Sequence, residues 1–122
     1  MFTISKEFRF EAAHTLNRAI ETEASRRIHG HSYRATVTLR GEPGTDGMVM
    51  DFGVLGRHLA RLRDALDHRF LDEVADLGPA TLENLARFIW SALYPACPTL
   101  TQVRVSRDSE GESCIFRGPG AP

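Results

Sequence analysis

Two stretches in which apolar and polar residues alternate limit most strongly what this chain can fold into. In the first stretch the apolar residues share one parity: Phe2, Ile4, Phe8, Phe10 and Ala12. The second stretch begins near His31 and repeats the pattern with Tyr33, Ala35, Val37 and Leu39. A period of two predicts strands with one buried face. The Gly- and Pro-containing segment 41–47 predicts the turn that ends the second strand.

After that turn the spacing of apolar residues changes to three or four, which is the period of an amphipathic helix. Two such stripes occur, Leu55/Leu59/Leu62/Leu66 and Leu82/Leu85/Ile89/Leu93. Asp51 and Thr81 stand where these helices would need N-terminal caps. Alternating residues return around Val103 and around Ile115, and the segment 108–111 between them is typical of a hairpin turn.

The order strand, strand, helix, helix, strand, strand predicts an α+β fold, with a four-stranded antiparallel sheet that carries both helices on one face. A length of 122 residues fits a single domain over residues 1–122, and the Gly- and Pro-containing end predicts a disordered tail at 118–122. Four strands leave two sheet edges that need partners. We therefore expect a homo-oligomer in which neighbouring subunits cover these edges.

Composition excludes several kinds of partner. The net charge of −1 argues against a general nucleic-acid binder. No apolar run approaches the ~20 residues that span a bilayer, and the first residues lack a signal-peptide pattern. Cys97 and Cys114 are too few for a disulfide scaffold and lack the spacing of a metal-binding pair. A cytoplasmic protein without nucleic-acid or membrane partners is the expectation.

Three histidines near the ends of the first two strands are candidates for metal binding. His29 and His31 are two residues apart, so both side chains point to one face of an extended backbone. His14 ends the partner strand and can reach the same place. Three imidazoles without a fourth protein ligand would leave an open position, as in catalytic zinc sites. A turn with exposed histidines is the alternative interpretation.

Other polar residues allow two interpretations. Asp67 precedes His68 and could fix the tautomer of its ring, although such pairs also occur on solvent-exposed turns. Glu83 and Asp108 can serve simply as a helix-start residue and a turn residue. Arg26 and Arg27 lie just before the histidine pair, where they could hold an anionic group or belong to a solvated loop.

Five short motifs together resemble a known family. They are Phe10-Glu11-Ala12-Ala13-His14, His29-Gly30-His31-Ser32-Tyr33, Val49-Met50-Asp51-Phe52, Leu66-Asp67-His68 and Thr81-Leu82-Glu83-Asn84-Leu85-Ala86. In this order they are similar to the 6-pyruvoyltetrahydropterin synthase / 6-carboxytetrahydropterin synthase family. The resemblance extends from about Phe2 to Arg117, and the ordered set is far more specific than any one motif.

The resemblance implies the tunnelling (T-) fold, with ββααββ order, and trimers that pair into hexamers whose sheets close into barrels. It implies a lyase that acts on 7,8-dihydroneopterin triphosphate. The bacterial branch makes 6-carboxytetrahydropterin for queuosine biosynthesis, and the animal branch makes 6-pyruvoyltetrahydropterin. The residues that match the family's Zn²⁺ ligands are His14, His29 and His31. The resemblance also implies that Asp67 and His68 are the catalytic pair and that Thr81 lies in the segment lining the pterin pocket.

Two positions depart from the family pattern. The catalytic cysteine lies four residues before the His-X-His motif in the bacterial branch and six before it in the animal branch, and these positions are Ser25 and Glu23 here. A serine hydroxyl needs a neighbouring base, so Glu23 is the better candidate for the general base. Some family members carry glutamate instead of the cysteine. The family's pterin-binding glutamate aligns with Asp108, which Glu110 or Glu112 could replace if the turn is shifted.

These observations lead to three hypotheses. The first is a zinc-dependent lyase that acts on a dihydropterin. The second is a zinc enzyme of the same fold with a changed, non-pterin substrate. The third is a catalytically silent, zinc-binding oligomer.

Overall fold

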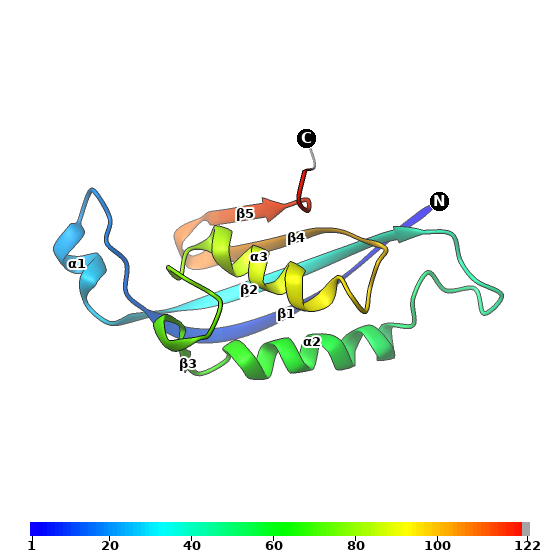
Figure 1. Cartoon of the computed structure of the whole chain (residues 1–122), viewed down its shortest axis with the longest axis horizontal. Helices are drawn as coiled ribbons and strands as arrows, with labels where there is room; N and C mark the ends of the chain where they lie inside the picture. Colours follow the sequence, from blue (N-terminus) through cyan, green and yellow to red (C-terminus); the bar gives the residue numbers. More distant parts are fainter. Residues whose placement is uncertain (121–122) are drawn as a thin grey trace.

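The computed structural model describes residues 1–120 and contains one five-stranded sheet (Figure 1). Strands β1 (Phe2–His14) and β2 (His29–Gly41) pair antiparallel along their whole length. Strand β4 (Leu100–Arg107) lies beside β2 and forms a hairpin with β5 (Glu112–Phe116). A two-residue strand, β3 (Arg69–Phe70), joins the other side of β1, which gives the order β3-β1-β2-β4-β5.

Helices α2 (Phe52–Leu66) and α3 (Leu82–Leu93) cover one face of the sheet. Figure 1 shows α3 over β2 and β4, with α2 running beside β1. The sheet turns one parity toward them, including Phe10, Tyr33, Val37 and Val105. Both leucine stripes expected from the sequence are buried against this face. In the described chain, no helix is long and apolar enough to cross a membrane.

The predicted α+β arrangement is confirmed, with two additions. All four expected strands are present and pair antiparallel, but β3 is a fifth strand that pairs parallel to β1, so the sheet is not purely antiparallel as expected. Strand β3 forms because His68 adopts φ +58° and donates its backbone N–H to the Glu11 carbonyl oxygen at 2.6 Å, which brings the next residues alongside β1. The two residues of β3 are too few to show the alternation of apolar and polar residues by which a strand is predicted from sequence. The expected loop before His29 contains a short helix, α1 (Thr22–Arg26), which is too short for an apolar stripe.

Two short 3₁₀ helices lie where the sequence has loops. The first, η1 (Leu71–Glu73), follows β3 directly. The second, η2 (Asp108–Glu110), forms the expected turn between β4 and β5, and Gly111 follows it with φ +67°. Because this turn connects the paired strands β4 and β5, the hairpin determines where the acidic residues of the turn lie, close to the candidate site.

Residues 119–120, within the predicted tail, form a turn. Gly118 has φ +95°, and a Cβ atom there would lie 2.7 Å from a ring carbon of Trp90. Only glycine therefore fits this close approach without a shift of the indole. Residues 121–122 of the predicted tail lie outside the described residues.

Both predicted helix caps are confirmed. Asp51 caps α2 by accepting a hydrogen bond from the Gly53 backbone N–H at 2.7 Å. Thr81 caps α3 by accepting one from the Asn84 N–H at 3.1 Å. In each case the side-chain oxygen satisfies a backbone donor that the helix cannot satisfy itself.

Replacement of Asp51 by alanine tests the first cap. We expect Asp51→Ala to lower the free energy of unfolding by about 1 kcal/mol, because the Gly53 N–H loses its acceptor. Asp51→Asn keeps an acceptor oxygen and should cost much less. Urea denaturation followed by circular dichroism measures both changes. Equal destabilisation by the two variants would contradict the capping role.

Candidate metal centre and active site

Three histidine side chains converge at one end of the β1–β2 pair. His14 lies directly opposite His29 in the antiparallel register, and His31 follows two residues along β2 on the same face. One ligand nitrogen from each of the three rings lies within 4.8 Å of the others. His14 is fully buried, whereas the other two are partly exposed. The expected convergence is therefore present in the structure.

Backbone carbonyl groups fix the orientation of two of these rings. His14 Nδ1 lies 2.9 Å from the Ala80 carbonyl oxygen, and His29 Nδ1 lies 2.7 Å from that of Arg27. A carbonyl oxygen only accepts, so each Nδ1 carries a proton and each neutral ring turns an Nε2 lone pair inward. These two Nε2 atoms are 2.9 Å apart. Two facing lone pairs repel each other unless a cation lies between them.

The donor set fits a transition-metal ion. Burial lowers the pKa of His14, and burial followed by the effect of His14 lowers the pKa of His31 to about 4. Both rings are therefore neutral at pH 7, which is the form that ligates metals. Zn–N bonds of 2.0–2.1 Å in a tetrahedron place nitrogens about 3.3 Å apart. The Nε2 atoms of His14 and His29 are 2.9 Å apart, which is close to that spacing. No fourth His, Cys, Asp or Glu of residues 1–120 joins the group, which leaves a position for another ligand.

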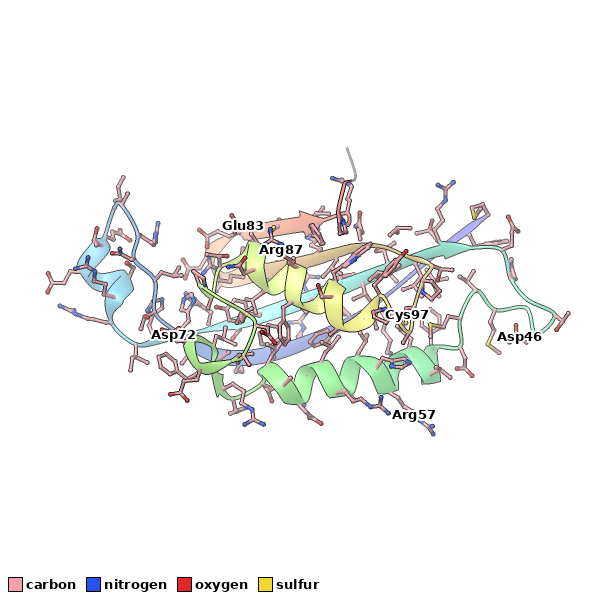
Figure 2. The ribbon with its side chains drawn as sticks, viewed as in Figure 1. Asp46, Arg57, Asp72, Glu83, Arg87 and Cys97 are labelled. Carbon is pink, nitrogen blue, oxygen red and sulfur yellow. The ribbon has the colours of Figure 1, made fainter. Side chains whose placement is uncertain are left out.

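Asp72 holds the chain immediately after His14. Its carboxylate accepts a hydrogen bond from the Thr15 backbone N–H at 3.0 Å and a second one from the Thr15 hydroxyl. Figure 2 shows Asp72 at the end of the molecule where β1 ends, far from Asp46 at the opposite end. Together with the Ala80 carbonyl group, Asp72 fixes the end of β1 that carries the buried ligand.

Asp67 and His68 form the expected pair. Asp67 Oδ2 lies 2.9 Å from His68 Nδ1, and the other carboxylate oxygen accepts from the Glu11 backbone N–H at 2.9 Å. This backbone hydrogen bond and then that from His68 hold the pKa of Asp67 below its usual range. The charged carboxylate favours a proton on His68 Nδ1 and leaves Nε2 facing outward. The His68 side chain is 78% exposed, so it can exchange protons with a ligand.

Two hollows adjoin the histidine cluster, and both are lined by His31 and Glu110. The first, which we call the His68 hollow, has a volume of about 570 Å³ and is also lined by Glu11, Gly30 and His68. The second, the His29 hollow, has a volume of about 480 Å³ and is also lined by Glu21, Ser25, His29 and Arg107. A ligand at His31 could therefore extend in either direction.

The two candidates for the general base are placed differently. The Ser25 hydroxyl lines the His29 hollow, but it lies 2.8 Å from the Thr22 carbonyl oxygen and accepts from the Arg18 N–H at 3.1 Å. Its single proton is thus used within the loop. Glu23 does not line either hollow, and its carboxylate pairs with Arg27 at 3.1 Å in solvent.

The candidates for substrate binding also differ in whether they lie beside the hollows. Asp108 forms an ion pair with Arg34 at 3.1 Å and accepts from the Ser106 hydroxyl at 3.0 Å, outside both hollows. The hydrogen bond from Arg34 is the main reason that the pKa of Asp108 is lowered. Thr81 caps α3, one residue after the carbonyl group that orients His14. Glu110 and Glu112 both line the His29 hollow beside the histidines, but Glu112 is paired with Arg107 at 2.9 Å, whereas Glu110 lines both hollows.

Sequence reasoning missed several residues of the His29 hollow, among them the charged residues Glu21 and Arg107. Glu21 precedes α1 with φ +57° in a polar loop without periodicity, so no pattern in the sequence marks it. Arg107 ends β4, and its position opposite Glu112 in the hairpin could have been inferred once the turn at 108–111 was placed.

Comparison with known proteins agrees with this geometry. The model of the family described as 6-pyruvoyl tetrahydropterin synthase matches residues 3–119. The chain belongs to this family. A 6-carboxy-5,6,7,8-tetrahydropterin synthase of Synechocystis sp. is 41% identical over 112 residues, which cover 86% of this chain and 85% of the relative. A 6-pyruvoyl tetrahydrobiopterin synthase of Dictyostelium discoideum is 34% identical, with 74% of this chain and 70% of the relative covered.

A solved structure from the same family supports the assignment. The 6-pyruvoyl tetrahydropterin synthase of Caenorhabditis elegans superposes with a TM-score of 0.80 at 26% identity, covering 96% of this chain and 95% of that one. The family resemblance and the tunnelling fold predicted from the sequence motifs are thereby confirmed. The family is one of tetrahydropterin synthases, so enzymatic activity is supported as well.

Substitution of single histidines tests the metal centre. We expect purified protein to bind about one transition-metal ion per chain, and His29→Ala or His31→Ala to weaken binding by about tenfold or more. Loss of a residue that merely hydrogen-bonds a metal ligand already lowers metal affinity by about tenfold or more, and loss of the ligand itself lowers it at least as much. His58→Ala, on α2 and outside the cluster, is the matched control. Elemental analysis after dialysis provides the measurement, and full retention of metal by both site variants would contradict the assignment.

Proposed function

We propose that this protein is a zinc-dependent lyase of the tetrahydropterin synthase type that acts on 7,8-dihydroneopterin triphosphate or a related dihydropterin. The observation that carries the proposal is the set of three converging imidazoles with an open position, next to the Asp67–His68 pair. Membership in the family and the names of its relatives point to a pterin substrate.

His14, His29 and His31 are the proposed metal ligands. A Zn²⁺ ion held by them would supply Lewis-acid polarisation of a substrate oxygen. The buried His14 ring, oriented by the Ala80 carbonyl group, provides the most rigid of the three donors. The chain's own contribution is to align these rings before any ligand binds.

His68 is the proposed proton-transfer residue, with Asp67 as the residue that orients it. The 2.9 Å contact to Asp67 keeps the proton on Nδ1, so Nε2 can accept a proton from a substrate group and return it. Since His31 and His68 line the same hollow, a substrate held at the histidine cluster lies within the same space as this base.

A carboxylate near α1 is the proposed partner base on the opposite side of the cluster. Glu21 lines the His29 hollow, and its nearest cation, Arg18, is 3.7 Å away. Glu23, the candidate from the sequence, lies outside the hollow and needs a shift of α1 to reach the cluster. The Ser25 hydroxyl is already engaged in hydrogen bonds within its own loop, so it is a poor base. We place Glu21 first, with Glu23 and Ser25 as the alternatives for the same step.

Glu110 is the proposed acidic residue for the ring end of the substrate. It lines both hollows, whereas Asp108 is held by Arg34 and Thr81 by its cap. A carboxylate can accept the amino and ring N–H groups of a pterin, and analogues without those donors would leave it unpaired.

The remaining expectations concern assembly and cellular context. The half-buried edge strand β5 and the two-residue edge strand β3 leave backbone groups for a neighbouring subunit, which supports a homo-oligomer. A hexamer built from two trimers follows from the family resemblance. Cytoplasmic location, a role in queuosine biosynthesis and the single domain over residues 1–122 stay predictions.

Incubation of the zinc-loaded protein with 7,8-dihydroneopterin triphosphate tests the proposed reaction. We expect a product with a tetrahydropterin mass, and a decrease in kcat of about 10²- to 10⁴-fold in His68→Gln because general acid–base catalysis is lost. Asp67→Asn should also lower kcat, because the His68 tautomer is no longer fixed. His58→Gln and Asp46→Asn are matched controls outside both hollows.

Three further variants compare the candidate bases. Glu21→Gln should lower kcat more than Glu23→Gln, and Ser25→Ala should mainly lower stability by removing the hydrogen bonds within the loop. Absence of any product from metal-loaded protein, by mass spectrometry, would overturn the pterin reaction.

A second candidate function is an enzyme of the same fold with a non-pterin substrate. The observation that favours it is the cationic residue Arg107 in the His29 hollow, together with the engagement of Asp108 by Arg34. Turnover of other metal-coordinating hydroxy compounds without turnover of dihydropterins would support this alternative.

A further inference from the structure

Arg107 brings a largely buried positive charge next to the histidine cluster. It is the last residue of β4, its side chain is only 14% exposed, and it lines the His29 hollow together with His29 and His31. One terminal nitrogen pairs with Glu112 across the hairpin at 2.9 Å. A guanidinium has five N–H donors, so most of its donors are not used by this pair.

The surroundings of Arg107 are short of acceptors. Arg107 Nε and the Tyr33 hydroxyl are both buried, and neither has a hydrogen-bond partner within the described chain. The guanidinium faces this hydroxyl, although the contact does not reach hydrogen-bond geometry. Such unpaired buried groups are costly in an interior, and they leave Arg107 without a fixed acceptor beyond Glu112.

The Tyr33 ring cannot turn away easily from this position. It stacks on Phe10 with ring centroids 4.9 Å apart, and it contacts the edges of the His14 and His31 rings at 6.4 and 5.8 Å. The tyrosine is 2% exposed. Tyr33 is thus a positioning residue behind Arg107, and Arg107 is the one that reaches the hollow.

The charges that line the His29 hollow favour an anion once the cluster holds a divalent cation. Arg18 pairs with Glu21 and Arg107 with Glu112, which leaves Glu110 as the only unpaired charge among the described residues of this lining. One negative charge does not balance a divalent cation held by neutral imidazoles. An oxyanion bound between the cluster and Arg107 would supply the missing negative charge and would accept from the terminal N–H groups of Arg107 that Glu112 does not use.

We propose that Arg107, backed by Tyr33, forms an oxyanion subsite in the His29 hollow, and that the substrate places a carboxylate or phosphate group there. This inference rests on the proposed function in one respect: the protein that binds the anion is the metal-loaded form. It assigns the role of choosing among substrates to a residue outside the three metal-binding histidines and the Asp67–His68 pair. Glu112 then competes with the ligand for the same guanidinium.

Isothermal titration of the zinc-loaded protein with inorganic phosphate, and separately with lactate, tests the subsite and distinguishes the two oxyanions. We expect Arg107→Gln to weaken binding of the preferred anion by about tenfold or more, since a charge-assisted hydrogen bond is lost. Arg107→Lys should recover part of the affinity. Glu112→Gln should strengthen binding, because the competing carboxylate is removed. Arg104→Gln, exposed on the same strand and outside the hollow, is the matched control.

Tyr33→Phe adds a readout that separates positioning from folding. It should weaken anion binding several-fold while leaving the unliganded protein at least as resistant to urea, because an unpartnered buried hydroxyl is removed. Unchanged affinity in Arg107→Gln, or no binding of either anion, would overturn the subsite even if dihydropterins are turned over. Anion binding that depends on Arg107 without dihydropterin turnover would overturn only the proposed function.

Discussion

The site depends on how two adjacent strands present their last side chains. The antiparallel register places His14 opposite His29, and two carbonyl groups hold the Nδ1 protons of these rings. Both Nε2 lone pairs must then face each other at 2.9 Å. This arrangement is unfavourable without a cation and favourable with one. A shift of one residue in the register would turn one ring to the opposite face and remove the cluster.

The fold supports this arrangement from both sides. Helix α3 begins just after Ala80, so the cap at Thr81 also places the carbonyl group that orients His14. Helix α2 ends just before Asp67, which links its C-terminus to the Glu11 backbone in β1 and to His68. Packing of the two helices on the sheet therefore positions both the proposed metal ligands and the proposed proton-transfer pair.

Much of this could be predicted from the sequence, because period and parity determine which side chains share a face. The alternation that buries Phe8 and Phe10 also buries His14, and the spacing of His29 and His31 sets the second half of the cluster. Contacts that depend on loops could not be predicted. The engagement of Asp108 by Arg34 and the hydrogen bonds of Ser25 within its own loop follow from tertiary placement, which no local pattern encodes.

The central claim is that three imidazoles hold one cation and leave it an open position. X-ray absorption spectroscopy of the zinc-loaded protein at the zinc edge tests this most directly. The account predicts three imidazole nitrogens at about 2.0–2.1 Å and one further light atom from solvent or ligand. A shell with a sulfur ligand, with four protein ligands or with fewer than three imidazoles would contradict it.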